Sequence, residues 1–303
     1  MSAADSDRCR VAAFRKARAR RRQGREARRY TAIAWTERTW NPIPGCSLVS
    51  GECRDCYAMK MAWRLSRIGR TAEKYRGLTR MTKAGAVWTG KQTLWEDELA
   101  KPLRWRKPTL IFVNSMGDTA YEQTPVDWFA RILEVMTEAH ARRGHLFQCL
   151  TKRPQNLARL LDLVGVHEPL PGIWWGVSAG NQKHWDERVP WLLDGAIPNC
   201  LPWVSVEPQL GPIDRDPVGL GWIVGGGEHQ TNRHHQARGF DLAWAYRLID
   251  RCQAAEVPVF IKQLGDNAWR AGQRFPTARA GANPAEWPED LRIRQYPAAW
   301  SGT

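Results

Sequence analysis

Short apolar runs alternate with amphipathic stretches along most of this chain. Runs of four to six apolar or β-branched residues are typical of buried strands, and apolar positions spaced three and four apart are typical of helices. The predicted strands cover residues 31–35, 109–113, 145–150, 173–177, 203–206, 222–224 and 257–261. The predicted helices cover residues 57–68, 94–104, 125–142, 154–163, 183–193 and 242–255. This alternation predicts an α/β fold built as a parallel β/α barrel, complete or partial.

An open, doubly wound parallel sheet is the alternative architecture for the same pattern. Both arrangements place a functional site at the carboxyl ends of the strands. Residues 69–94 show no clear period and predict an excursion that contains a short hairpin. The expected domains are a basic tail at 1–29, a barrel domain at 30–265 and an irregular C-terminal extension at 266–303.

Composition narrows the class of protein. With 303 residues, 43% of them hydrophobic, the chain can bury a sizeable core. No apolar run approaches the 18 residues of a membrane span, and the Arg-rich start has no apolar segment behind it as a secretory signal would. Seven cysteines form no paired framework, which favours a reducing compartment. We therefore expect a cytoplasmic protein without a membrane partner.

The positive charge is concentrated at the start of the chain. The formal net charge is +14, and residues 8–29 alone hold ten Arg and one Lys against one Glu. Such a block is typical of contact with the phosphates of nucleic acid, so nucleic acid is the expected partner of residues 8–29. A solvated extension with no specific partner is the alternative.

Three cysteines within eleven residues form the strongest candidate for a metal site. Cys46, Cys53 and Cys56 have the spacing C-x6-C-x2-C, in a loop rich in Ser and Gly. A structural zinc site needs four protein ligands, and no histidine precedes His140. An iron–sulfur cluster can be held by three cysteines with one iron left open. Iron–sulfur, zinc and three unrelated thiols all remain possible at this point. The other cysteines in apolar elements, Cys149, Cys200 and Cys252, are expected in the core.

Several short runs carry a family resemblance. They are Trp35 to Cys46, Cys53 to Ala58, Phe112 to Asp118, Leu150 to Pro154, Gly176 to Ser178, Ser205 to Pro208, Ile223 to Glu228 and Phe260 to Gln263. Together they resemble the phage and prophage three-cysteine-motif family, which is itself similar to radical S-adenosylmethionine enzymes. The usual spacing in that superfamily is C-x3-C-x2-C with an aromatic residue before the third cysteine. Here the first gap is six and the aromatic residue, Tyr57, follows.

The resemblance implies a cofactor pair and a chemistry. A [4Fe-4S] cluster on Cys46, Cys53 and Cys56 would bind S-adenosylmethionine, whose reductive cleavage gives a radical that abstracts hydrogen from the substrate. A reductase or flavodoxin-type electron donor would then be a partner. The phage association implies the host cell cytoplasm and, with the basic tail, a nucleic acid or nucleobase as substrate for modification or repair. The alternative function is a nucleic-acid-binding protein with a structural zinc or iron–sulfur site and no catalysis.

Polar residues follow the predicted strands, where a barrel places its chemistry. The run from Gly221 to Glu228 also fits the pattern G-x-I-x-G-x-x-E, in which radical S-adenosylmethionine enzymes bring backbone close to adenine. The candidate cofactor contacts are Asn114, Ser115, Ser178, Gly225 and Glu228. The candidate catalytic residues, which would position substrate or move protons, are Lys152, Glu207 and Lys262.

Overall fold

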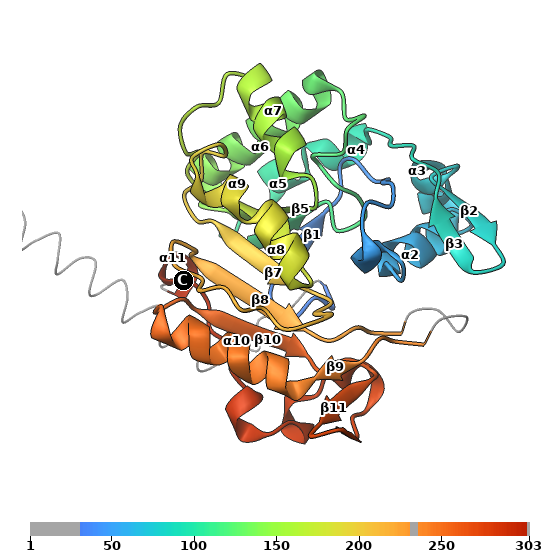
Figure 1. Cartoon of the computed structure of the whole chain (residues 1–303). Coiled ribbons are helices and arrows are strands. Elements are labelled where there is room, and N and C mark those ends of the chain that lie inside the picture. Colours follow the sequence, from blue (N-terminus) through green and yellow to red (C-terminus); the bar gives the residue numbers. More distant parts are fainter. Residues whose placement is uncertain (1–30, 231–235, 302–303) are drawn as a thin grey trace, which may run out of the picture.

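Seven parallel strands form one curved sheet at the centre of the molecule (Figure 1). The structure, a computed structural model, describes residues 31–230 and 236–301. The strands are β1 (Arg38–Trp40), β4 (Leu110–Val113), β5 (Leu146–Thr151), β6 (Ile173–Ser178), β7 (Trp203–Val206), β8 (Trp222–Gly226) and β10 (Val259–Gln263). Their order in the sheet follows their order in the chain, and β1 and β10 are the two ends. A doubly wound sheet would reverse its strand order, so the prediction of a partial parallel β/α barrel is confirmed.

Helices cover the outer face of this sheet (Figure 1). They are α6 (Val126–Arg143), α7 (Pro154–Leu163), α8 (Gln182–Arg188), α9 (Pro190–Leu193) and α10 (Leu242–Ala254). Side chains alternate along each strand, so Ile111 and Val113 of β4 join the core beneath the helices. Leu110 and Phe112 face the inside of the half-barrel, which is filled by four buried tryptophans, Trp35, Trp174, Trp203 and Trp222.

The first predicted strand is wrong. Residues 31–35 form turns and bends, and the strand that pairs with β4 begins at Arg38. The apolar character of this run reflects burial of Trp35, which packs edge-on against Phe112 and Trp203 inside the half-barrel. Two predicted helices are also divided. Residues 94–104 contain α4 (Glu96–Leu99) and α5 (Lys101–Arg104), and 183–193 breaks between α8 and α9. Pro102 and Pro190 lie in the first turns of α5 and α9, where the missing N–H is tolerated.

A small lobe projects beside the carboxyl ends of the strands (Figure 1). It contains η1 (Gly51–Cys53), α2 (Tyr57–Leu65), η2 (Gly69–Thr71), α3 (Ala72–Tyr75) and the antiparallel pair β2 (Thr79–Thr82) and β3 (Gly85–Trp88). The hairpin predicted within residues 69–94 is therefore confirmed. Its own apolar cluster joins one face of α2, with Ala58, Met59 and Ala62, to Leu78 and Trp88.

The C-terminal extension packs against the edge strand of the sheet. Ile261 N donates to Ile293 O at 2.9 Å, and Gln295 N donates to Val259 O at 3.0 Å, so this segment covers the open edge of β10. A second sheet pairs β9 (Phe240–Asp241), β11 (Ala268–Arg270) and β12 (Gln273–Arg274). The remaining elements are short: η3 (Arg279–Gly281), η4 (Pro284–Glu286), η5 (Glu289–Leu291) and α11 (Ala298–Ser301).

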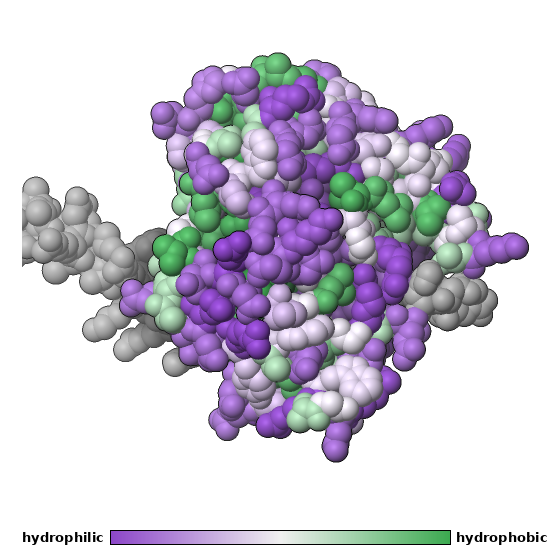
Figure 2. All heavy atoms as spheres, viewed as in Figure 1, coloured by the Kyte–Doolittle hydropathy of each residue, from purple (hydrophilic) through white to green (hydrophobic). Residues whose placement is uncertain are grey.

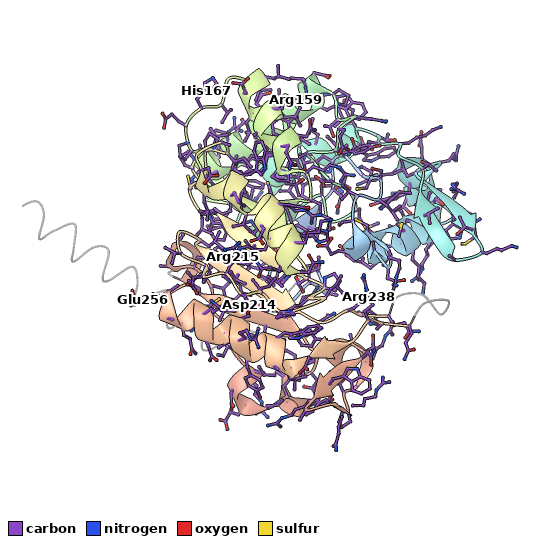
Figure 3. The ribbon with its side chains drawn as sticks, in the orientation of Figure 1. Arg159, His167, Asp214, Arg215, Arg238 and Glu256 are labelled. Carbon is purple, nitrogen blue, oxygen red and sulfur yellow. The ribbon has the colours of Figure 1, made fainter. Side chains whose placement is uncertain are left out.

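The connection from β7 to β8 has no helix and is held by ion pairs instead. Asp214 accepts from Arg247 of α10 at 2.9 Å, and Arg215 donates to Asp186 of α8 at 2.8 Å. Figure 3 shows Asp214 and Arg215 where this connection crosses between the two helices. Within the described residues, no helix is both long and apolar enough to cross a membrane. The basic tail at 8–29 lies outside the described residues.

Candidate functional site

The inward-facing positions at the carboxyl ends of β5 to β10 bring four of the predicted residues into two pairs. Lys152 Nζ lies 3.2 Å from Ser178 Oγ, and Lys262 Nζ lies 3.0 Å from Glu207 Oε1. The two-residue period explains the grouping, because Ser178 follows Trp174 on the inner face of β6 and Lys262 follows Phe260 on β10. The predicted catalytic residues thus lie on one rim of the half-barrel.

Glu207 is hydrogen-bonded to Trp35, one of the four tryptophans inside the half-barrel. Trp35 Nε1 donates to Glu207 Oε2 at 3.1 Å, while Lys262 pairs with the other carboxylate oxygen. Both groups remain partly exposed, with side-chain exposure of 26% for Lys262 and 13% for Glu207. This carboxylate–ammonium pair can bind a polar group or hold a proton at the carboxyl ends of β7 and β10.

Asn114 and Ser115 serve the loops around the cysteines. Asn114 has a positive φ of 53°, its Oδ1 accepts from Ile43 N at 3.2 Å, and its Nδ2 donates to Thr119 at 2.7 Å. Ser115 Oγ donates to Asn41 Oδ1 at 3.1 Å, and Ser115 O accepts from the Tyr57 hydroxyl at 2.8 Å. Both side chains are engaged within the protein, which gives each a structural role in positioning the cysteine loop.

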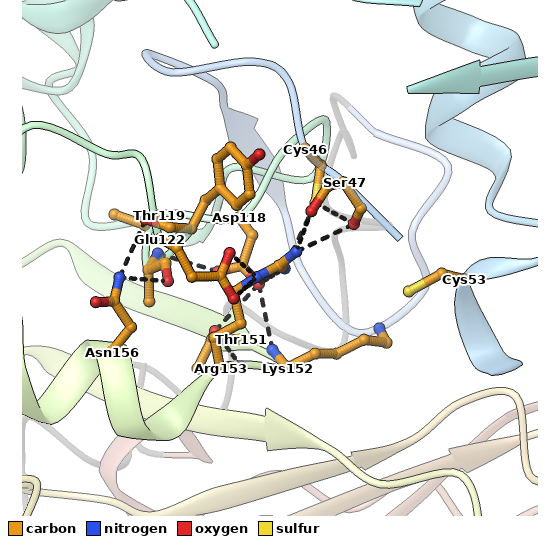
Figure 4. Close-up of polar contacts among 12 residues, drawn as sticks. Cys46, Ser47, Cys53, Asp118, Thr119, Glu122, Thr151, Lys152, Arg153 and Asn156 are labelled. Atoms are coloured by element: carbon orange, nitrogen blue, oxygen red, sulfur yellow. Dashed lines mark hydrogen bonds and ion pairs between the residues drawn. The ribbon is translucent and has the colours of Figure 1, made fainter. Parts of the chain in front are cut away.

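Arg153 clamps the start of the cysteine loop, defined here as residues 46–56, onto the end of β5 (Figure 4). Its guanidinium donates to Ser47 Oγ at 2.8 Å, to Asp118 Oδ2 at 3.0 Å and to Glu122 at 2.8 Å. Arg153 Nη1 also lies 3.7 Å from Cys46 Sγ. The residue is almost fully buried. The sequence carried a signal for it, since Arg153 follows Lys152 directly at a predicted strand end.

The three thiols share one electrostatic environment. Burial raises the pKa of Cys46 to about 12, with Asp118 adding to the rise and Arg153 opposing it. Burial also raises the pKa of Cys56, and the charge of Lys152 opposes that rise. Cys46 and Cys56 each feel the charge of Cys53, and both pack against the apolar cluster beneath α2. Deprotonating Cys46 and Cys56 therefore requires a positive centre to replace the lost hydration.

A buried glutamate inside the cysteine motif ties the loop to β6. Glu52 Oε1 accepts from Gly180 N at 2.9 Å and lies 2.7 Å from His184 Nδ1 and 3.4 Å from Arg188 Nη1. Burial works against its ionisation, but hydrogen bonds from Ser50 and Gly180 and the charges of Lys152 and Arg188 lower its pKa overall. Sequence reasoning missed Glu52, although a single acid beside Cys53 in a loop of Ser and Gly was a usable signal.

Glu228 lies at the same end of the sheet as the cysteine loop, as the sequence predicted. Arg238 N donates to Glu228 Oε2 at 2.8 Å, Arg238 Nε donates to the same oxygen at 3.0 Å, and Arg238 Nη1 donates to Gly51 O at 2.8 Å. Burial opposes the ionisation of Glu228, but the bonds from Arg238 lower its pKa overall. Figure 3 shows Arg238 below the helix that Figure 1 labels α2. Arg238 had no signal in the sequence, because its partner lies ten residues earlier across a loop.

Two neighbouring glycines of β8, Gly225 and Gly226, face opposite sides of the sheet. A Cβ added to Gly225 would lie 3.1 Å from Leu248 Cδ2 of α10, so this glycine serves packing beneath a helix. A Cβ on Gly226 would lie 2.9 Å from Gln263 O and 3.4 Å from Glu207 Oε1, on the inner side. The expectation that Gly225 clears space for adenine is therefore wrong about the direction of that position. Alternation from inward-facing Val224 would have selected Gly226.

The donors suit an iron–sulfur cluster in kind and number. All six described cysteines are free, and Cys46, Cys53 and Cys56 are half-buried on one loop. In residues 31–230 and 236–301, no group of three or more His, Cys, Asp or Glu side chains is close enough to hold a metal ion. Holding a cluster would therefore require the loop to draw its sulfurs together. Cys149 and Cys252 are buried as expected, but Cys200 is exposed and its thiol donates to Leu170 O.

Comparison with known proteins places the chain by family only. No curated protein and no solved structure matches it. Residues 30–287 match the model of one protein family. Because this match spans well over half of the 303 residues, the chain belongs to the family described as "Protein of unknown function (DUF5131)".

Proposed function

We propose that this protein is an iron–sulfur enzyme of the radical S-adenosylmethionine type that acts on a nucleic acid or nucleobase. The observation that carries the proposal is the placement of three free thiols on one loop at the carboxyl rim of a parallel half-barrel. Barrel enzymes keep their chemistry at this rim. The resemblance of the cysteine loop and strand ends to the three-cysteine-motif family supports the same cofactor pair.

The cations around the loop suit an anionic cluster. Three thiolates on a [4Fe-4S] centre carry negative charge into a half-buried site, and Arg153 and Lys152 both act to lower thiol pKa values there. Arg153 is itself fixed by Asp118 and Glu122, so its guanidinium keeps its place beside Cys46. When bound, the cluster would supply the electron for reductive cleavage of S-adenosylmethionine.

The chain's own residues would then bind and orient cofactor and substrate. Lys152, with Ser178, can donate hydrogen bonds to a carboxylate or hydroxyl close to the cysteine loop. Lys262 of β10 and Glu207 at the end of β7, the two strands that flank β8, form a donor and acceptor pair that could bind a base edge or a sugar hydroxyl. Trp35 closes the space below Glu207 and excludes water from that side.

One experiment tests the proposal directly. Full-length protein reconstituted anaerobically with iron and sulfide should be brown, with broad absorbance near 400 nm, and should form 5′-deoxyadenosine from S-adenosylmethionine and dithionite. Cys46→Ala, which removes one ligand, is the matched control and should form none. A colourless protein that retains stoichiometric zinc would instead support a nucleic-acid-binding protein with a structural metal.

A further inference from the structure

A second basic segment lies in the folded body of the protein. Residues 57–91, the part of the lobe that follows the cysteine loop, hold nine Lys and Arg against one Glu, a net charge of +8. Residues 8–29 carry +10 and the whole chain +14, so the remaining residues are net acidic. The positive charge of the protein is thus divided between the tail and this one lobe.

Most of these cations are exposed and lack a carboxylate partner. Arg64, Arg67, Arg70, Arg76, Arg80, Lys83 and Lys91 are exposed, and within the described part of the chain none of these seven forms an ion pair. Lys74 differs from these seven, because it is buried and its ammonium lies 3.5 Å from the Glu98 carboxylate. A solvated surface with both signs interspersed would pair several of them, whereas a surface that binds a polyanion leaves them available.

The helix α2 directs part of this charge away from its own core. Ala58, Met59 and Ala62 are buried beneath the hairpin, so the opposite face carries Tyr57 and Arg64, with Arg67 in the next turn. The guanidinium of Arg67 stacks on the indole of Trp63 at 3.3 Å, which presents a flat cationic surface to solvent. Figure 2 shows hydrophilic and hydrophobic side chains mixed over the lobe at the right of the view, with hydrophilic ones projecting at its outer edge.

This face begins at the cysteine loop. Tyr57 follows Cys56 directly, and its hydroxyl reaches back to Ser115 O at 2.8 Å, so the first turn of α2 is fixed to the rim. Arg64 lies two turns further along the helix, about 10 Å from Tyr57 at 1.5 Å per residue. A phosphate contact at Arg64 would therefore lie close to a base that reaches the rim.

We propose that the exposed face of α2 and the following turn, with Arg64, Arg67 and Arg70, is a docking surface for the phosphodiester backbone of a base-accessible, single-stranded nucleic acid. Phosphates would lie along the cations and a base could stack on exposed aromatic or guanidinium planes. The proposal rests on the proposed function only in its choice of nucleic acid. It adds a contact within the folded body that is separate from the Arg-rich tail.

Salt dependence of binding tests this surface in the full-length chain. The probe is a fluorescein-labelled 20-nucleotide single-stranded DNA, measured by anisotropy over a series of salt concentrations, with RNA and duplex DNA of the same sequence as further arms. The triple variant Arg64→Gln, Arg67→Gln and Arg70→Gln should reduce the slope of log K against log salt by about 2, at about 0.7 for each lost phosphate contact. The triple Arg-to-Lys variant should keep the wild-type slope.

The control removes three cations from the opposite end of the sheet. Arg106, Lys107 and Arg143 are exposed and lie before β4 and β5, away from the cysteine loop. Changing these three to Gln should leave the slope as in the wild type. Equal slopes for both glutamine triples would overturn the proposal. Poly-glutamate serves as a second probe. If the Arg64, Arg67 and Arg70 glutamine triple no longer bound poly-glutamate but kept the wild-type DNA slope, the proposal would also be overturned, because the surface would then bind an acidic polypeptide. Neither readout depends on cofactor cleavage, so failure here is distinct from failure of the proposed function.

Discussion

Glu52, in the middle of the cysteine motif, accepts a hydrogen bond from the backbone N–H of Gly180, two residues after the end of β6, at 2.9 Å. The carboxylate has no exposed side-chain surface and is surrounded by Arg188, His184 and Ser50. A loop rich in Ser and Gly has no strong intrinsic preference for a single conformation. The contacts of the buried Glu52 carboxylate therefore fix the position of the cysteines relative to the strands.

The first prediction concerns the stability contributed by this buried group. Glu52→Gln keeps the shape and one acceptor but leaves Arg188 buried without its counter-charge, so we expect a loss of about 3 kcal/mol in the free energy of unfolding. Urea denaturation followed by tryptophan fluorescence would measure it. Glu96→Gln, which breaks an exposed ion pair with Arg131, is the control and should change stability little. Similar losses in both variants would contradict the role given to Glu52.

The second prediction concerns acid stability. The folded-state pKa values of Glu52 and Glu228 both lie below their usual range. A lowered folded pKa contributes stability that is complete above the unfolded pKa, about 4.3 for Glu, and is lost as the pH falls through the lower folded value. Stability of the wild type should thus decline from near pH 4 downward, and the decline should be shallower in Glu52→Gln. An identical slope in both proteins over that pH range would refute the assignment.

Local pattern was sufficient for the barrel strands and for the side chains that face inward from them. The strands predicted from residue 109 onward are present. Each is a short apolar run, which is the pattern expected of a parallel strand that is buried on both faces. Lys152, Ser178, Glu207 and Lys262 were found because strand ends and alternation are local properties. Residues 31–35 failed because Trp35 is apolar for a non-local reason, burial inside the half-barrel.

Contacts between distant segments were not accessible to the same reasoning. Arg238 joins Glu228 to Gly51, which lies 187 residues away along the chain, and no periodicity encodes that bond. The outward direction of Gly225 depends on Leu248 of α10, a packing partner that only the folded structure identifies. The sequence therefore located the rim, while the residues that fix the cysteine loop to it required the structure.

The third prediction concerns metal content. Cys46→Ala, Cys53→Ala and Cys56→Ala should each lose most of the iron bound after anaerobic reconstitution, because two remaining thiolates hold a cluster poorly. Cys149→Ala and Cys252→Ala, which remove buried thiols beneath the helices, should keep it, as should Cys200→Ala at the surface. Iron and sulfide assays per protein chain provide the measurement. Full iron content in any of the three motif variants would exclude that cysteine as a ligand.

The fourth prediction separates the outward-facing Gly225 from the inward-facing Gly226 of β8. Gly226→Ala places a methyl group 2.9 Å from Gln263 O, a backbone atom that cannot withdraw without breaking the β8–β10 pairing. Gly225→Ala meets only Leu248 Cδ2 at 3.1 Å, the end of a flexible side chain. We expect Gly226→Ala to lower the melting temperature by several degrees, as a loss of about 1–3 kcal/mol would in a protein of this size. A larger drop in Gly225→Ala would show that the packing beneath α10 is the tighter constraint.

The fifth prediction concerns Glu228, whose partner Arg238 also donates to Gly51 O in the cysteine loop at 2.8 Å. Glu228→Gln preserves size but removes the charge that orients Arg238, so the bond to Gly51 should weaken and residues 47–56 should exchange amide hydrogen faster. Iron content should stay at the wild-type level, since none of the three thiols is changed.

If this end of the half-barrel receives S-adenosylmethionine, the affinity of Glu228→Gln for that cofactor should fall roughly tenfold to a hundredfold, the expected loss for a charge-assisted hydrogen bond of about 1.5–3 kcal/mol. Arg238→Lys should have the same effect on exchange, because an ammonium cannot span Glu228 and Gly51 as the guanidinium does. Unchanged exchange in both variants would show that this bridge does not hold the loop, and unchanged cofactor affinity would remove Glu228 from the cofactor site.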